Sequence, residues 1–143
     1  MDARNRRFTM KVFFRLHILS IVVFLAIDAV WLGILAKDFY RIHLGSILPL
    51  TLLVAPALIF YLLFTAGIVF FAVIPAMQKN SLRSALLRGA FFGLVTYGTY
   101  DLTNHATIAN WPIIVTIADM SWGSFLTAAV SATTFGLGRR WVK

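Results

Sequence analysis

The sequence contains no cysteine. This absence excludes disulfide bonds, thiolate-bound metals, iron–sulfur clusters and thiol nucleophiles. The sequence also lacks a phosphate-binding loop, a dinucleotide-binding glycine fingerprint and a serine–histidine nucleophile motif. No two histidines are placed to bind haem at one level of a membrane. We therefore predict no cofactor, and the chemistry of this chain is left to carboxyl, imidazole, hydroxyl and aromatic groups.

Charged residues are also scarce in this sequence. Only 13% of the 143 residues are charged and only five are acidic, whereas soluble domains carry about 25% charged residues. Hydrophobic residues make up 60% of the chain and the mean hydropathy is +0.86. Apolar runs of about 20 residues are typical of helices that cross a lipid bilayer. The composition predicts a single membrane domain over residues 1–143, with the lipid bilayer as its first partner.

The apolar runs divide the chain into four predicted membrane-spanning helices. They cover about residues 12–36, 47–74, 84–104 and 112–137. The predicted fold class is all-α, a polytopic four-transmembrane-helix bundle. Within the second span, Pro56 is expected to cause a kink and Pro75 to mark the helix end.

The basic residues predict the orientation of these spans. They gather before the first span and at its border, between the second and third spans and just inside the third, and after the fourth: Arg4, Arg6, Arg7, Lys11, Arg15, Lys79, Arg83, Arg88, Arg139, Arg140 and Lys143. The opposite side carries only Lys37 and Arg41. Because positively charged loops stay in the cytoplasm, both termini are predicted to be cytoplasmic. The net charge of +8 is explained by this flanking pattern, so we predict no nucleic-acid partner.

Three aspartates interrupt the predicted spans without a lysine or arginine beside them: Asp28, Asp101 and Asp119. Acidic side chains in hydrocarbon are costly, and they usually face a bundle interior and have a function. With a rise of 1.5 Å per residue, the three lie about 6, 10 and 7 Å outward from the centres of their spans. The sequence therefore predicts one acidic layer in the outer half of the membrane, where three charges cannot coexist without compensation.

Aromatic residues accompany these carboxyl groups. Trp31 follows Asp28 by three residues and Trp122 follows Asp119 by three, so each pair shares a helix face. Aromatic faces beside carboxylates form cation–π pockets, and core packing of the two tryptophans is the alternative. We predict an outward-facing acidic–aromatic pocket that binds a proton or ligand through Asp28, Asp101, Asp119, Trp31, Trp122, Tyr97 and Tyr100, with Asn104 and His105 at its mouth.

Other interpretations of these residues stay open. The aspartates can act structurally, paired at the outer rim with Lys37, Arg41, His43 or His105. Asp101 and His105 are one helical turn apart, which allows a metal site without specifying one, so metal binding is left unknown. The segment 37–41 forms either a short interfacial helix that caps the acidic layer or a solvated loop. By default, Tyr40 and Trp111 are interfacial belt residues.

Several motifs carry a family resemblance. They are Asp28-x-x-Trp31-Leu-Gly33, Lys37-Asp38-Phe39-Tyr40, Tyr97-Gly-Thr-Tyr100-Asp101-Leu-Thr-Asn104, Trp111-Pro112 and Asp119-x-x-Trp122-Gly123. With these, the chain resembles a family of small bacterial inner-membrane proteins catalogued as a domain of unknown function. The resemblance implies four spans and a multi-pass location in the bacterial inner membrane. It implies no activity, substrate or catalytic residue.

Three function classes follow from the sequence. We favour a membrane binding or transport protein for a proton, a cation or a small cationic or amphipathic ligand. The alternatives are a membrane-embedded enzyme that modifies lipids with a carboxyl acid/base, and an accessory subunit of a larger complex. Enzymatic activity is uncertain and is not favoured. A homodimer is expected, because it would bury the small-residue helix faces better.

Overall fold

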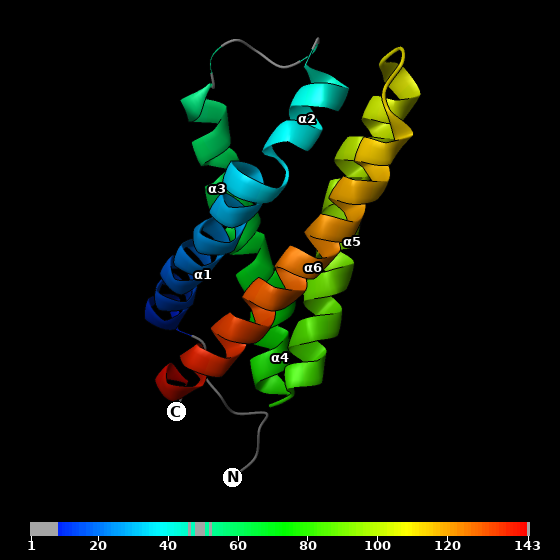
Figure 1. Cartoon of the computed structure of the whole chain (residues 1–143). Helices are drawn as coiled ribbons and strands as arrows, with labels where there is room; N and C mark the ends of the chain where they lie inside the picture. Colours follow the sequence, from blue (N-terminus) through cyan, green and yellow to red (C-terminus); the bar gives the residue numbers. More distant parts are fainter. Residues whose placement is uncertain (1–8, 46, 48–50, 52, 143) are drawn as a thin grey trace.

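The computed structural model describes residues 9–45, 47, 51 and 53–142, and the elements found there are helical. They are α1 (Met10–Val30), the π-helical η2 (Trp31–Leu35), α2 (Lys37–Leu44), α3 (Val54–Ile68), the π-helical η3 (Val69–Val73), α4 (Ile74–Gln78), α5 (Leu82–Thr107), α6 (Ile113–Gly138) and the short η4 (Arg139–Trp141). Figure 1 shows the helices side by side, with α5 and α6 forming an antiparallel hairpin. The predicted all-α fold class is confirmed.

Over the described part of the chain, three helices are long and apolar enough to cross a membrane: Met10–Leu35, Val54–Gln78 and Ile113–Trp141. The first and the last coincide closely with the predicted spans 12–36 and 112–137. The second ends later than predicted, and part of its predicted start, between 47 and 53, lies outside the described residues. The predicted span 84–104 falls within α5, a helix of 26 residues. Because α5 is richer in polar residues, it is not among the three candidates, and its crossing stays a prediction.

The prolines of the second span behave differently from the prediction. Pro56 lies in the first turn of α3, where a missing N–H costs no hydrogen bond, so no kink results there. The predicted helix end at Pro75 was wrong, because the helix continues to Gln78. The π-helical turn before it shifts the hydrogen bonding, with the N–H of Ile74 donating to the carbonyl of Val69. This wider turn accommodates the proline ring inside a continuous helix.

Glycines bring α5 and α6 close together. A β-carbon on Gly93 would collide with the carbonyl of Gly123, and one on Gly89 would collide with Ser131. The Ser124 hydroxyl donates to the carbonyl of Ala90 at 3.1 Å across the same contact. The small-residue face predicted from Gly89 and Gly93 is therefore where the two helices meet.

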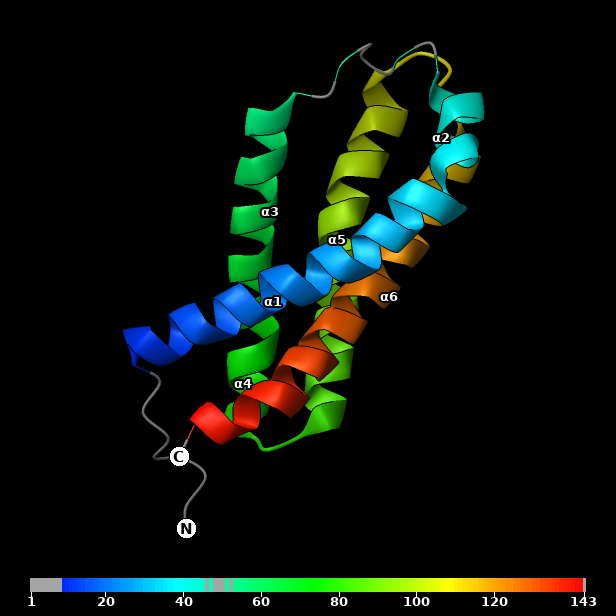
Figure 2. The same ribbon diagram turned by 60° about the vertical axis from the view of Figure 1, so that its left-hand side comes forward.

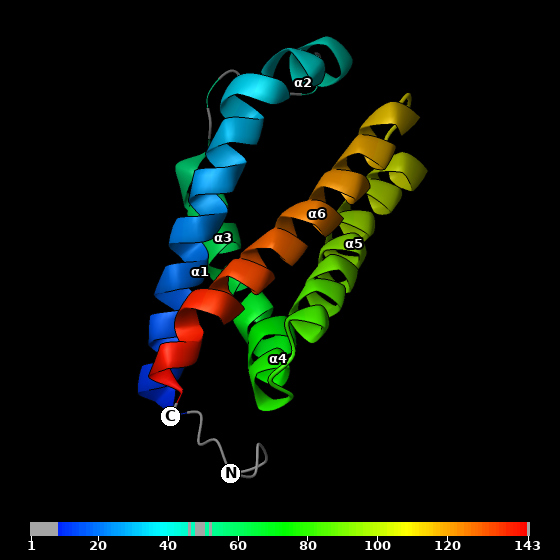
Figure 3. The same cartoon turned by 60° about the horizontal axis from the view of Figure 1, so that its bottom comes forward.

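Helices α1 and α3 complete the bundle. A hydrogen bond of 3.1 Å joins Ser20 of α1 to Thr134 of α6, and His17 Nε2 lies 3.0 Å from Thr65 Oγ1 of α3. Phe24 is fully buried at the centre of the apolar core. Figure 3 shows the end of α6 crossing the start of α1, so the two helices close one end of the bundle.

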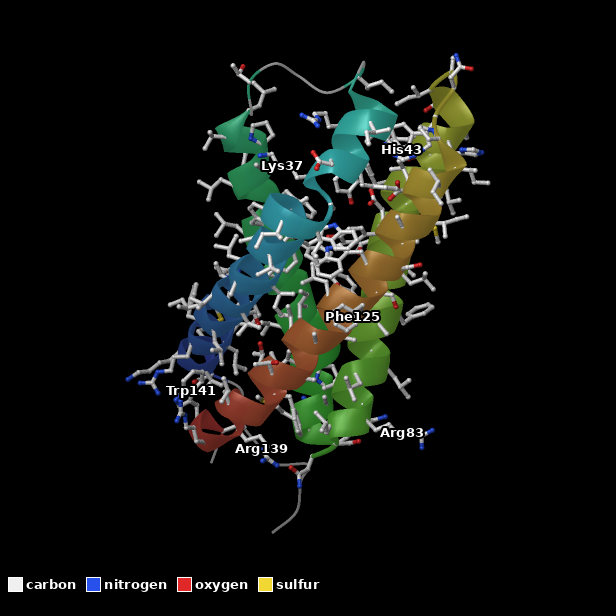
Figure 4. The ribbon with its side chains drawn as sticks, in the orientation of Figure 1. Lys37, His43, Arg83, Phe125, Arg139 and Trp141 are labelled. Atoms are coloured by element: carbon white, nitrogen blue, oxygen red, sulfur yellow. The ribbon has the colours of Figure 1, made fainter. Side chains whose placement is uncertain are left out.

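The two ends of the bundle differ in charge. Figure 4 places Arg83 and Arg139 at the end of the bundle where α1 begins and α6 ends, and Lys37 and His43 at the other end. We call these the basic end and the α2 end. The predicted clusters at Arg4, Arg6, Arg7 and Lys143 lie outside the described residues. The cytoplasmic location of the basic end stays a prediction.

Candidate functional site

The two Asp-x-x-Trp motifs meet in the fold. Helices α1 and α6 run in opposite directions (Figure 1), which brings the end of α1 beside the first turns of α6. The rings of Trp31 and Trp122 stack with centroids 4.3 Å apart and planes 9° from parallel. The two motifs, which have the same Asp-x-x-Trp spacing, are therefore in direct contact in the fold.

Asp28 receives one donor on each carboxylate oxygen. Trp122 Nε1 donates to Oδ1 at 3.4 Å, and the Tyr61 hydroxyl donates to Oδ2 at 3.3 Å. Both bonds are longer than the usual 2.7 to about 3.2 Å for such pairs. Asp28 is only 6% exposed, so its charge is removed from water and weakly compensated by these donors.

Asp119 is held by a chain of donors from α1 and α2. The Tyr40 hydroxyl donates to Asp119 Oδ1, and Trp31 Nε1 donates to the Tyr40 hydroxyl at 3.2 Å. Burial, and then the hydrogen bond to Asp119, raise the pKa of Tyr40 above its ordinary value. The phenol therefore keeps its proton and acts as the donor.

The position of Tyr40 decides between two sequence interpretations. Segment 37–41 belongs to a helix, α2, and not to a solvated loop. The default assignment of Tyr40 as a belt residue was wrong, because its ring is half-buried and reaches Asp119. Trp111 is also buried, and its Nε1 donates to Thr116 Oγ1 at 3.1 Å, so it too is a packing residue.

A cavity of about 550 Å³ connects these groups. Six predicted site residues line it, and they are Asp28, Trp31, Tyr97, Tyr100, Asp119 and Trp122. Seven further lining residues were missed: Leu32, Tyr40, Leu44, Phe60, Tyr61, Phe64 and Thr96. Tyr61 had a signal in the sequence, because it and Thr65 are a polar pair one turn apart in an apolar span. The apolar residues had none, since nothing local distinguishes them from lipid-facing side chains.

Asp101, Asn104 and His105 do not join the cavity lining. Asp101 is fully buried on α5, and both of its carboxylate oxygens lack a hydrogen-bond partner among the described residues. Asn104 and His105, one turn further along α5, are likewise not among the lining residues. The structure thus brings two of the three predicted aspartates to one cavity.

The rim cations do not neutralise these carboxyl groups. Arg41 pairs with the exposed Asp38 at 3.1 Å, and His43 Nδ1 lies 2.8 Å from the carbonyl of Phe39. No lysine, arginine or histidine is among the described residues that line the cavity. Within the described ranges, no cluster of three or more potential metal ligands is found. The site is an acidic–aromatic cavity without a built-in counter-ion in its lining.

The stacked indoles give a spectroscopic prediction. Two parallel indoles at 4.3 Å couple their electronic transitions, so the wild-type protein is expected to show a paired positive and negative band in circular dichroism. Trp31→Phe and Trp122→Phe should each abolish this pair. Trp141→Phe should leave it intact, because Trp141 lies at the basic end (Figure 4). Persistence of the pair in both cavity variants would contradict the stacked geometry.

Comparison with known proteins gives one match. The model of a family described as "Predicted membrane protein (DUF2177)" matches residues 13–136. No curated protein and no solved structure matches the chain. The matched range contains both Asp-x-x-Trp motifs and all the cavity-lining residues.

Proposed function

The chain belongs to the DUF2177 family of predicted membrane proteins, and we propose that it binds an organic cation in the cavity between Asp28 and Asp119. The observation that carries the proposal is the pairing of two carboxylates with a stacked pair of indoles in one cavity, where none of the lining residues that the structure describes is basic. A cation is the ligand whose charge these carboxylates and aromatic rings compensate best. It pairs with the carboxylates and is attracted by the faces of the aromatic rings.

The size of the cavity favours an organic cation over a bare ion. About 550 Å³ lies within the range of roughly 300–1,000 Å³ that small-molecule sites occupy. A metal ion needs several oxygen ligands converging within about 2.5 Å of one point. Here the two carboxylates come from different helices and are already contacted by tyrosine and tryptophan donors. A quaternary or primary ammonium fits the space, the charge and the aromatic walls together.

The place of the cavity in the bundle suggests the direction of access. Its residues come from the half of the molecule that carries α2, away from the basic end (Figures 1 and 4). With the basic end in the cytoplasm, as the charge distribution predicts, the cavity lies in the outer half of a bacterial inner membrane. We propose that α5 is the fourth span, and that cation binding is the recognition step of transport.

Choline provides the direct test, because it has a neutral isostere. Protein in lipid nanodiscs would be titrated with choline and with dimethylbutanol, its uncharged carbon analogue, while the tryptophan fluorescence is recorded. Saturable quenching by choline, with affinity at least about 10-fold above that of the isostere, is expected if charge carries about 1.4 kcal/mol or more of the binding free energy. Equal responses to the two compounds would overturn the proposal.

Tyr40→Phe tests the link between α2 and the cavity. The substitution removes the donor to Asp119 and the acceptor of Trp31. A buried polar group left without its partner costs about 1–3 kcal/mol, so the thermal stability in detergent should fall. Tyr100→Phe is the matched control, since Tyr100 also lines the cavity but is 60% exposed. Equal stability of the two variants would show that the Tyr40 contact contributes nothing.

A further inference from the structure

Some of the residues by which α3 and α5 line the cavity are also exposed at the outer surface of the bundle, and the cavity draws on both helices. On α3 it is lined by Phe60, Tyr61 and Phe64, and on α5 by Thr96, Tyr97 and Tyr100. Phe60 is 46% exposed and Tyr100 60% exposed, although both contribute to the cavity wall. In Figure 2, α3 and α5 are clearly separated towards the α2 end. Residues that line the cavity therefore also face the surface that surrounds the bundle.

Towards the basic end, aromatic packing closes the same gap. The ring of Phe92 on α5 stacks on Phe64, with centroids 5.6 Å apart, and on Phe71, at 5.5 Å. Gly67 leaves room for Phe92, because a β-carbon there would meet its ring at 2.7 Å. The opening is therefore limited to the half of the bundle that contains the carboxylates.

The exposed surface of α3 is apolar. On α3, Leu58, Ile59, Leu62 and Leu63 are all exposed large hydrophobic residues, and α3 belongs to a helix long and apolar enough to cross a membrane. In a bilayer such a face contacts the acyl chains of lipids. The opening thus leads from hydrocarbon to the carboxylates, without a basic side chain among the described residues that line the cavity.

We infer that the cavity binds the ammonium head group of a membrane amphiphile, which enters laterally between α3 and α5 and leaves its alkyl chains in the bilayer. The inference rests on the proposed cation binding and names the ligand class and its route. Because the lining, as far as the structure describes it, has no lysine, arginine or histidine, a phosphate group meets no counter-ion among these residues. The head group is therefore expected to be a cation without phosphate.

The test uses ligands that differ only in their chains. Choline carries no alkyl tail, whereas dioctadecyldimethylammonium carries two long chains that a cavity of about 550 Å³ cannot enclose. Nanodiscs would contain either this cationic amphiphile or the anionic phosphatidylglycerol at equal mole fraction. We expect the cationic amphiphile to quench the tryptophan fluorescence and to weaken choline binding at least about 10-fold, and phosphatidylglycerol to do neither.

The outcomes separate the inference from the proposed function. Choline binding that is unaffected by the two-chain ammonium would overturn lateral entry and leave cation binding standing. Absence of binding by both ligands would overturn both. Displacement of choline by phosphatidylglycerol as well would overturn the preference for a head group without phosphate.

A pair of variants on α5 tests the opening itself. Thr96→Phe adds a ring at the cavity wall, and Thr99→Phe adds the same ring on the exposed face of the same helix. Thr96→Phe is expected to weaken the binding of the two-chain ammonium more than the binding of choline. Thr99→Phe is expected to change the binding of neither ligand. Thermal unfolding verifies that both variants fold. If folded Thr96→Phe leaves the effect of the two-chain ammonium unchanged, the opening does not lie between α3 and α5.

Discussion

Asp28→Asn and Asp119→Asn are each expected to lower the choline affinity by about 10-fold to 100-fold, because a hydrogen bond or ion contact to a charged partner contributes about 1.5–3 kcal/mol. Asparagine keeps the shape of the carboxyl group and removes its charge. The stacked tryptophans and the helix contacts should remain, so the variants should fold. Titration in nanodiscs by tryptophan fluorescence measures the affinity, and native mass spectrometry of gently extracted protein would show whether a bound cellular ligand disappears from the variants.

Asp38→Asn is the matched control for this loss. Asp38 lies on α2 beside the cavity helices, but its side chain is 74% exposed and pairs with Arg41 at the surface. It undergoes the same chemical change and should leave choline binding at the wild-type level. Wild-type affinity in both Asp28→Asn and Asp119→Asn would contradict cation binding between the two carboxylates. An equal loss in Asp38→Asn would mean that surface charge, and not the cavity, attracts the cation.

Gly93→Ala is expected to give the largest loss of stability. The added β-carbon would collide with the carbonyl of Gly123 and the side chain of Thr127, and a backbone carbonyl cannot move aside without separating α5 from α6. Overpacking of this kind costs about 1–3 kcal/mol or more. Thermal or denaturant unfolding in detergent measures the loss, and choline binding should weaken in parallel, because α5 and α6 both line the cavity.

Gly136→Ala gives the comparison on α6. A β-carbon there meets nothing within 4 Å, and alanine is a better helix former than glycine by about 1 kcal/mol. This variant should be as stable as the wild type or slightly more stable. Equal stability of the Gly93→Ala and Gly136→Ala proteins would show that the close contact of α5 with α6 is not needed for the fold.

Local sequence patterns were sufficient to predict the helices and six of the thirteen described residues that line the cavity. Long apolar runs require helices in a bilayer, because only internal hydrogen bonding satisfies the backbone there. The spacing of Asp28 with Trp31, and of Asp119 with Trp122, put each pair on one helix face, and these faces meet in the structure. Small residues at Gly89 and Gly93 predicted a close helix contact without naming α6 as its partner.

The sequence by itself determined that this chain is an all-helical membrane protein with carboxylates among aromatic residues, because periodicity, depth and burial cost are properties of single helices. Only the tertiary structure decided which side chains share one cavity, because that depends on how separate helices cross. The crossing brings Tyr40 to Asp119 and Tyr61 to Asp28, and it leaves Asp101 buried but outside the cavity lining. It also places Phe60 of α3 and Tyr100 of α5 both on the cavity wall and at the exposed surface, where we propose that the ligand enters.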